Sequence, residues 1–457
     1  MRYKVDKSLI KFSQQFNDAG YACYLVGGAV RNLYAGLPVS DYDFATDARP
    51  DDVQRLFKRV IPTGIKHGTV TVLYAGHNLE VTTFREDGEY TDSRRPDNVQ
   101  FTPSIFEDLK RRDFTINSMA YDLVTGVLLD PHEGKADLER KLIRAIGVPS
   151  ERFQEDALRI MRACRFAAQL DFIIDDDTLA GMTEKAENLR AVSAERIRDE
   201  LEKILKAEKP STAFRVMEKT GILKVILPEL ASCRGVDQKG YHDFDVLDHM
   251  LYSCDGAPPE NAEVRLAALL HDIGKPSVIN WDELGIPTFH SHELLSVSIS
   301  RDIIQRFKFP KAFEKHVLLL IEQHMFHYQN EWTDSAVRRF IARVGVENIK
   351  NLFVLRRADQ FGMRGSKILP LNLIEFQKRI EAILEAENAF RISDLKINGN
   401  TLQKDGGIPR GPALGKVLEF LLESVLEDPE LNNEEKLLEI GIKFYSERLK
   451  QNDRSTQ

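Results

Sequence analysis

The sequence predicts an α+β protein with a small mixed sheet near the N-terminus and helical domains after it. Short apolar runs bounded by glycines and polar turns occupy roughly the first 125 residues, which is typical of a mixed α/β segment. After about residue 136, apolar residues recur at helical spacing almost to the C-terminus. We therefore expect a mixed N-terminal head, followed by an all-helical remainder.

The same patterns predict the individual elements. In the head, helices are expected at 7–19 and 29–35, and strands at 21–26, 41–45, 69–74 and 79–84. Gly76-His77-Asn78 is expected to form the turn between the last two strands. The polar segment 85–101 includes Arg94 and Arg95, lacks periodicity and is expected to be a mobile loop. Further helices are expected at 155–170, 194–207, 212–220, 262–270, 292–306, 313–324 and 414–426.

Length and composition indicate a multidomain cytoplasmic protein. The chain has 457 residues, 42% hydrophobic and 29% charged, and contains neither a long apolar run nor an apolar leader. Its four cysteines are far apart, which favours reduced thiols over a zinc site or disulfides. The net charge of -8 argues against a uniformly basic nucleic-acid surface but permits a local basic groove. No feature indicates the oligomeric state.

Three carboxylates in the predicted head suggest a metal-dependent phosphoryl transfer site. Asp41 and Asp43 are two residues apart on a predicted strand, so both side chains point to one face. Glu80 begins another strand and can supply a third carboxylate. Converging carboxylates repel one another unless a cation lies between them, and Mg²⁺ prefers such oxygen ligands. A solvated strand end is the alternative interpretation of the two aspartates alone.

Two other segments of the head can bind phosphate. Gly27-Gly28 separates a predicted strand from a predicted helix, and Arg31 follows one turn later. Such a turn brings backbone N–H groups close to a phosphate, although most such glycine pairs are simply tight turns. Lys110-Arg111-Arg112 is either a triphosphate clamp or the basic start of a helix.

The predicted helix 155–170 carries Asp156, Arg159, Arg162 and Arg165 at three-residue spacing. A carboxylate can accept from the exocyclic amino group of cytosine or adenine while an arginine donates to the neighbouring acceptor. Uracil and guanine would present a carbonyl to the carboxylate and leave buried groups unpaired. Asp156 and Arg159 are thus candidates for selecting C and A without a template. A structural stripe of ion pairs is an equally good interpretation of this helix alone.

A separate histidine-rich stretch suggests a second metal site. Most of the eleven histidines lie between residues 242 and 327. Within and just after it, His249, His271-Asp272 and Asp359 follow the order H…HD…D. Imidazoles together with carboxylates suit several divalent metals, and a metal-bound water can attack a phosphoester. His292 and His324 are candidate ligands of a second metal ion.

These motifs resemble the class II tRNA nucleotidyltransferases, which are the CCA-adding enzymes, and their bacterial poly(A) polymerase relatives. The matching segments are LVGGAVRN with DYD, EVTTFR, RRDFTIN, EDALRIMRACRF and ERIRDEL, over about 175 residues. Near the C-terminus, ISDLKINGNTL and GPALGKVLEFLLESVL are also similar to the family. The H…HD…D residues resemble the HD phosphohydrolase superfamily, which is fused behind the transferase in some bacterial CCA-adding enzymes.

The resemblance implies a function and residue roles. The chain would add CCA to tRNA from CTP and ATP with Mg²⁺, and a divalent metal would serve the HD domain. Asp41 and Asp43 would bind the catalytic metals with Glu80 as third carboxylate. Gly28, Arg31 and Arg112 would hold the triphosphate, Asp156 and Arg159 would recognise the base, and Arg162 and Arg165 would support the nucleotide. The 85–101 loop matches the segment associated with switching from C to A addition.

Two positions depart from the family pattern, because Asn32 stands where an aspartate is usual and Ser118 where an alanine is usual. The first difference removes a negative charge near the phosphates and can alter how the nearby arginine or metal is held. The second difference changes little volume.

Several specificities stay open. The loop disfavours a CC-adding enzyme but does not separate a CCA-adding enzyme from an A-adding one that works with a CC-adding partner. A poly(A) polymerase is less favoured because residues 411–457 are more acidic than basic. A tRNA-binding HD phosphohydrolase with an inactive transferase site is the alternative of another class.

The predicted domains are a nucleotidyltransferase head (1–135), a neck with the base-recognition helix (136–207), a body (208–241), an HD domain (242–365) and a C-terminal tail for tRNA (366–457).

Overall fold

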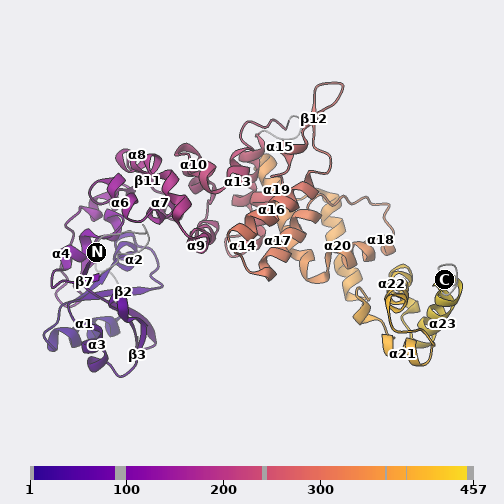
Figure 1. Ribbon diagram of the computed structural model, residues 1–457, viewed down its shortest axis with the longest axis horizontal. Helices are drawn as coiled ribbons and strands as arrows, with labels where there is room; N and C mark the ends of the chain where they lie inside the picture. Colours follow the sequence, from indigo (N-terminus) through magenta and orange to yellow (C-terminus); the bar gives the residue numbers. More distant parts are fainter. Residues whose placement is uncertain (1–4, 88–98, 239–243, 366–367, 387–388, 450–457) are drawn as a thin grey trace. The chain divides into compact units, whose positions relative to one another are not determined.

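The computed structural model describes residues 5–87, 99–238, 244–365, 368–386 and 389–449. It divides into two compact units, one formed by Met1–Ser232 with Arg306–Lys308 and the other by Cys233–Gln305 with Phe309–Gln457. Figure 1 shows the first unit in indigo to magenta, with the sheet at its start and helices after it. Among the described residues, no helix combines the length and apolar character needed to cross a membrane.

The first unit is built on a mixed sheet, as the sequence predicts, but the sheet has seven strands, of which β3, β8 and β9 were not predicted. Its strands lie in the order β3-β4-β5-β2-β1-β8-β9, and only the β2–β5 pair is parallel. The strands are β1 (Cys23–Val26), β2 (Tyr42–Thr46), β3 (Val60–Gly64), β4 (Thr69–Tyr74), β5 (His77–Thr83), β8 (Ala120–Tyr121) and β9 (Leu128–Leu129). The α+β class with a mixed head sheet is therefore confirmed.

One face of this sheet forms the core of the head. Val70, Val72, Leu79 and Val81 alternate along β4 and β5 and are buried. On the same side, Phe12 of α1 (Lys7–Asp18) packs against Phe44, with ring centroids 4.9 Å apart. The residues between these apolar positions face the opposite side, where the candidate site lies.

One turn of the head differs from the sequence expectation. Ala75 and Gly76 form the β4–β5 turn with φ values of 49° and 86°, so His77 and Asn78 belong to β5, paired with Tyr74 and Leu73. The predicted turn is thus displaced toward the C-terminus, because a two-residue turn with positive φ suffices here.

The expected loop 85–101 begins and ends in paired strands. β6 (Arg85–Asp87) and β7 (Val99–Phe101) form an antiparallel ribbon. Residues 88–98, including Arg94 and Arg95, lie outside the described residues. The prediction of an irregular segment is therefore wrong at both of its ends.

The predicted continuous helix 155–170 is also wrong at its start. The chain forms α6 (Pro149–Glu155) and α7 (Leu158–Leu170), and Asp156 between them has the extended values φ -141° and ψ 102°. The Asp156 side chain accepts a hydrogen bond from the Leu158 backbone N–H at 3.0 Å, which stabilises the break. Asp156 therefore does not share a helical face with the three arginines of α7.

The remaining helices of the first unit lie both among the strands of the head and after them. They are α2 (Gly28–Ala35), α3 (Pro50–Leu56), α4 (Ile105–Lys110), α5 (Gly134–Glu139), α8 (Asp176–Glu184), α9 (Ala194–Leu205), α10 (Ser211–Lys219), α11 (Ile222–Ile226) and α12 (Pro228–Ala231). The short strands β10 (Leu142–Ile143) and β11 (Ile173–Ile174) pair in parallel.

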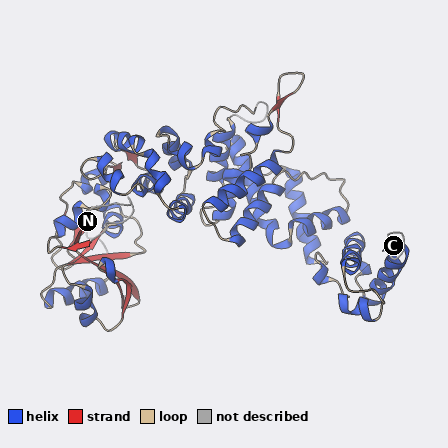
Figure 2. Cartoon of the chain, in the orientation of Figure 1, coloured by secondary structure: helices blue, strands red, loops and turns tan. Residues whose placement is uncertain are grey.

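The described part of the second unit is helical apart from the hairpin of β12 (Asn280–Trp281) and β13 (Pro287–Thr288), as Figure 2 shows. Its helices are α13 (Val246–Gly256), α14 (Ala262–Leu270), α15 (Lys275–Val278), α16 (His292–Arg306), α17 (Lys311–Gln323), α18 (Asp334–Val344), α19 (Val346–Arg364), α20 (Leu371–Glu385), α21 (Gly399–Lys404), α22 (Pro412–Glu427) and α23 (Glu434–Phe444). The expected helices beginning near residues 262, 292, 313 and 414 are confirmed.

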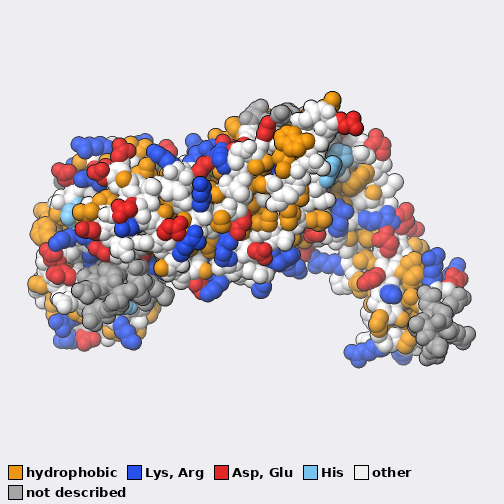
Figure 3. All heavy atoms as spheres, turned by 45° about the horizontal axis from the view of Figure 1, so that its top comes forward, with side chains coloured by type: hydrophobic (Ala, Val, Ile, Leu, Met, Phe, Trp, Pro, Cys, Tyr) orange, Lys and Arg blue, Asp and Glu red, His pale blue; other side chains and the backbone are white. Residues whose placement is uncertain are grey.

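Charged side chains are mixed over the surface. On the face shown in Figure 3, acidic and basic side chains are interspersed among apolar ones. A nucleic-acid site on this protein therefore depends on local geometry, as the net charge of -8 suggests.

Candidate active site

A cavity of about 1190 Å³ in the first unit brings the predicted transferase residues together. Its walls come from the open face of the sheet, the start of α2, the segment after α4, and α7 with α9. The ten predicted residues that line it are Gly28, Arg31, Asp41, Asp43, Glu80, Arg112, Asp156, Arg159, Arg162 and Arg165.

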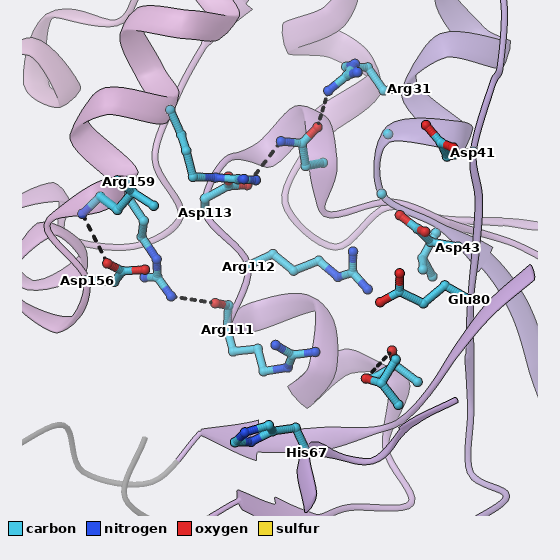
Figure 4. Close-up of a pocket in the computed structure, with 18 of the residues that line it drawn as sticks. Arg31, Asp41, Asp43, His67, Glu80, Arg111, Arg112, Asp113, Asp156 and Arg159 are labelled. Carbon is cyan, nitrogen blue, oxygen red and sulfur yellow. Dashed lines mark hydrogen bonds and ion pairs between the residues drawn. The ribbon is translucent and has the colours of Figure 1, made fainter. Parts of the chain in front are cut away.

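The three carboxylates lie at one end of this cavity (Figure 4). Asp43 of β2 is the register partner of Glu80 in parallel β5, and Asp41 directly precedes β2. Burial, together with the negative charges of Glu80 and Asp41 and against the opposing charge of Arg112, raises the pKa of Asp43 to about 6. Mutually repelling carboxylates in a partly buried position fit a divalent cation, which would relieve that repulsion.

Gly27 lets the backbone pass close to the carboxylates and to Arg112. Its φ is +65°, and a Cβ at this position would lie 3.1 Å from Arg112 Nη1 and 3.9 Å from Asp43 Oδ2. A larger residue would therefore be strained and would crowd the arginine. Helix α2 begins at the next residue, so its N-terminus faces the same space.

Arg31 is held by two asparagines. Its Nη1 donates to Asn117 Oδ1 at 2.7 Å, and its Nε and Nη2 donate to Asn32 Oδ1 at 3.1 and 2.9 Å. Asn32 in turn donates to the Pro38 carbonyl at 2.9 Å. Burial lowers the pKa of Arg31 to about 10. The unusual Asn32 thus orients Arg31 without neutralising it.

The basic segment is anchored by a buried aspartate. Arg111 Nη2 and Arg112 Nη2 lie 2.7 and 3.1 Å from the two carboxylate oxygens of Asp108. In Figure 4, Arg112 extends toward Asp43 and Glu80. The sequence predicts the two arginines as site residues but not Asp108, although its position three and four residues before them on α4 is the spacing of helical ion pairs.

Asp156 and Arg159 line the cavity but are not paired with each other. Asp156 Oδ2 accepts from Arg196 Nη2 of α9 at 2.8 Å. Arg159 Nη1 donates to Glu155 at 2.8 Å, and its Nη2 donates to the Arg111 carbonyl at 3.0 Å. Arg196 was missed as a site residue, although it lies in the ERIRDEL segment that matches the family, because the sequence does not show which face of helix 194–207 meets the cavity.

The other two arginines of α7 are fixed by carboxylates. Arg162 Nη2 lies 2.7 Å from Asp113 Oδ2, and Arg165 Nη1 lies 3.1 Å from Glu200 Oε2. Despite burial, Arg162 and the Asn117 amide lower the pKa of Asp113 to about 2, so this carboxylate is ionised at neutral pH. These ion pairs fix the guanidinium groups of Arg162 and Arg165 beside the cavity.

The predicted metal ligands of the second unit form a buried cluster around Asp272. Asp272 Oδ2 lies 3.3 Å from His249 Nε2 and 3.2 Å from His271 Nε2. Its other oxygen, Oδ1, lies 3.0 Å from His292 Nε2 and 3.7 Å from His324 Nε2. Asp359 Oδ1 lies 3.3 Å from His249 Nε2. All six predicted residues are thus together, with one aspartate between two histidine pairs.

Backbone carbonyls orient three of these imidazoles. The Nδ1 atoms of His271, His292 and His324 lie 2.9, 2.8 and 2.7 Å from the carbonyls of Ala268, Phe289 and Ile321. Such bonds place the proton on Nδ1 and present the Nε2 lone pair to the centre. The Nε2 atoms of His249 and His271 are only 3.0 Å apart, and those of His292 and His324 are 3.3 Å apart. Converging lone pairs beside carboxylates fit bound divalent cations.

Comparison with known proteins shows the family to which the chain belongs. It is 35% identical over 433 residues to the CCA-adding enzyme of Lactobacillus johnsonii, covering 93% of this chain and 94% of the relative. The chain belongs to the class II CCA-adding enzyme and poly(A) polymerase family. The CCA-adding enzyme of Ligilactobacillus salivarius is 31% identical over 445 residues, with 97% and 98% covered.

Family models and a solved structure agree with this membership. Residues 23–144 match the "Poly A polymerase head domain", residues 171–234 the "Probable RNA and SrmB- binding site of polymerase A", and residues 293–440 the model for tRNA nucleotidyltransferase domain 2. The crystal structure of the Bacillus stearothermophilus CCA-adding enzyme in complex with CTP superposes with a TM-score of 0.72 at 27% identity, covering 97% of this chain and 98% of that one. As a member of this family, the chain carries a nucleotidyltransferase head in its first unit.

Proposed function

We propose that this protein adds CCA to the 3′ end of tRNA, using CTP and ATP and releasing pyrophosphate. The observation that carries the proposal is the cavity in which three carboxylates face an array of arginines and the Asp156 carboxylate. Near full-length similarity to enzymes named as CCA-adding supports it.

Each group has a distinct part in the proposed reaction. Asp41, Asp43 and Glu80 would hold divalent cations, with Mg²⁺ suited to their oxygen ligands. Such a cation supplies Lewis-acid stabilisation to the α-phosphate. The Gly28 backbone, Arg31 and Arg112 would bind the triphosphate and stabilise the departing pyrophosphate, while the tRNA 3′-hydroxyl attacks the α-phosphorus.

We assign base selection to the side of the cavity that lies away from the three carboxylates. Asp156 would accept from the amino group of cytosine or adenine, and Arg159 would donate to the adjacent acceptor. Arg162 and Arg165, each held by a carboxylate, would support the nucleotide. We assign the C-terminal segment 366–457 to the tRNA itself.

The test uses two tRNA transcripts, one lacking CCA and one ending in CC, with CTP and ATP singly and together. Completion of CCA on the first transcript is the expected result. Extension of only the CC-ending transcript by one A would make the protein an A-adding enzyme. Long A tails on unrelated RNA would make it a poly(A) polymerase, and no extension would shift the function to the second unit.

We further propose that the histidine cluster is a phosphohydrolase centre. Asp272 with its two histidine pairs and Asp359 would hold one or two divalent ions, whose identity the donor set leaves open. Lys275 Nζ lies 2.6 Å from Asp272 Oδ2, so the lysine ammonium also stabilises this carboxylate in its ionised form. A cyclic or terminal phosphoester of a nucleotide is the expected class of substrate.

This second proposal is tested by metal content and hydrolysis. The purified protein should contain a bound divalent metal and hydrolyse 2′,3′-cyclic nucleotides or nucleoside 2′-phosphates after metal loading. His271→Ala should remove both properties. Metal-loaded protein without hydrolysis of any phosphoester would leave the cluster a structural metal site.

A further inference from the structure

Four threonines on the sheet form a hydroxyl-bearing strip beside the catalytic carboxylates. This threonine strip consists of Thr63 of β3, Thr69 and Thr71 of β4, and Thr82 of β5. All four line the cavity, whereas the alternate residues Val70, Val72 and Val81 are buried in the core. Valine would satisfy the strand preference equally well, so the hydroxyl groups are not required by the fold.

The strip continues the row of carboxylates across the sheet. Asp43 of β2 pairs in register with Glu80 of β5, and Glu80 pairs with Thr71 of β4. In the next row on the same face, Thr82 pairs with Thr69. The hydroxyls therefore start at the carboxylates and lead away from them toward the β3 edge.

The hydroxyls are paired in a way that leaves protons for a ligand. The oxygens of Thr63 and Thr71 are 3.0 Å apart, and those of Thr69 and Thr82 are also 3.0 Å apart. In each pair one O–H donates to the other oxygen, and the accepting hydroxyl has its own proton to donate outward. Phosphodiester oxygens and ribose hydroxyls accept such hydrogen bonds.

The direction of the reaction places the RNA on this side. Phosphoryl transfer brings the attacking oxygen in line with the leaving group, on opposite sides of the phosphorus. In the proposed reaction, pyrophosphate departs toward Gly28 and Arg31, which follow β1, and toward Arg112, whose Nη1 lies 3.1 Å from the position of a Cβ at Gly27. In sheet order, β5, β4 and β3 lie on the other side of β2. This arrangement favours an approach of the attacking 3′-hydroxyl over the threonine strip.

The size of the cavity and the position of the Arg85 guanidinium both indicate that the cavity can hold a second ligand beside the nucleotide. Its volume of about 1190 Å³ exceeds the ~300–1,000 Å³ usual for a single small-molecule site. Arg85, which lines the same cavity, donates to the backbone carbonyl of His67. Its guanidinium is thereby held near the strip, where a phosphate of the RNA backbone would be attracted.

We propose that the threonine strip binds the terminal nucleotides of the RNA that is extended, through their phosphate and ribose oxygens. This inference rests on the proposed nucleotidyltransferase function. It assigns Thr71 and Thr69 as positioning residues for the attacking 3′-hydroxyl and makes no distinction among bases, which suits a terminus that changes with each added nucleotide.

The test measures CMP incorporation with Thr71→Val and with the double variant Thr69→Val/Thr71→Val. Losing one hydrogen bond should raise the KM for a tRNA transcript lacking CCA by about 3- to 10-fold, and the double variant should raise it further. The KM for CTP and the melting temperature should stay at wild-type values. Thr71→Ser, which restores the hydroxyl, should recover the tRNA KM.

Thr125→Val is the matched control, since Thr125 is an exposed threonine of the same head that is not among the cavity residues. A second measurement places 4-thiouridine at the 3′ end of the transcript and maps the photocrosslinked peptide. The expected crosslinks lie within residues 60–85. Crosslinks confined to α2 or α7 would overturn the inference.

The inference is also overturned if the valine variants leave the tRNA KM unchanged, or raise the KM for CTP equally, while wild-type protein adds CCA normally. Wild-type protein that adds no nucleotide to tRNA would instead refute the proposed function, and this inference would fall with it.

Discussion

The two candidate metal sites differ in how their ligands are held. In the head, Asp41 and Glu80 are exposed, and Asp43 lies in a partly buried position. In the second unit, all six residues of the histidine cluster are buried, and backbone carbonyls fix three of the imidazoles. An open carboxylate site suits cations that arrive with a nucleotide, whereas an enclosed histidine site suits a metal that stays.

The largest predicted effect is the loss of CMP incorporation on substitution of Asp43, which should leave the other site unaffected. Asp43→Asn should lower the rate of CMP incorporation by on the order of 10³-fold, because a metal ligand beside the α-phosphate is lost. Tight metal binding by the histidine cluster should be unchanged. Incorporation is measured with labelled CTP, and near wild-type incorporation would contradict the assignment of Asp43.

The complementary change concerns His271. His271→Ala should abolish both tightly bound metal and phosphohydrolase activity, since its Nε2 lies in the centre of the cluster. CCA addition should change less than about threefold if the two sites work separately. Elemental analysis after dialysis gives the metal content, with exposed His290→Ala as control. Unchanged metal content would refute the cluster as a metal site.

A smaller effect is expected at Arg196, which is the hydrogen-bond partner of the proposed base-recognition carboxylate. Arg196→Ala should reduce the preference for CTP over UTP by about 10-fold, because Asp156 loses the contact that orients it. The ratio of kcat/KM values for the two nucleotides is the measurement, and Arg190→Ala, an exposed residue of the same unit, is the control. An equal loss for both nucleotides would indicate a purely structural role.

The smallest effect is a pH-dependent shift in melting temperature of metal-free protein. Burial raises the pKa of Asp43 from 3.8 to about 6, so folding favours its protonated form. That contribution to stability is present below about pH 4 and is lost as the pH rises through 6. Metal-free Asp43→Asn should therefore melt a few degrees above wild type at pH 7.5 but close to it at pH 4.5. Equal melting temperatures at pH 7.5 would show that ionisation of Asp43 does not destabilise the folded protein.

Much of both sites could be predicted from sequence because their residues are chemically distinctive and clustered in short motifs. The sequence predicts Asp41, Asp43 and Glu80 as carboxylates of one site on two strands, and the H…HD…D order predicts the histidine cluster; the in-register pairing of Asp43 with Glu80 comes from the structure. The bridging position of Asp272 could not be predicted, because it depends on how four helices pack.

The errors have local physical causes. Apolar periodicity continues through residue 156, so the break made by the Asp156 side chain accepting from a backbone N–H was invisible. Arg196 and Asp108 were overlooked because their partners lie across an interface or on a charged helix face that looks solvated in sequence. Ion pairs formed between side chains of different elements are the part of the site that the sequence does not predict.

The most direct test sequences the 3′ ends of a tRNA transcript lacking CCA after incubation with all four nucleoside triphosphates, using wild-type and Asp43→Asn proteins. We expect wild type to add C, C and A and then stop, and the variant to add nothing. Mixed or U-containing ends, continuous A tails, or unaltered CCA addition by the variant would contradict it.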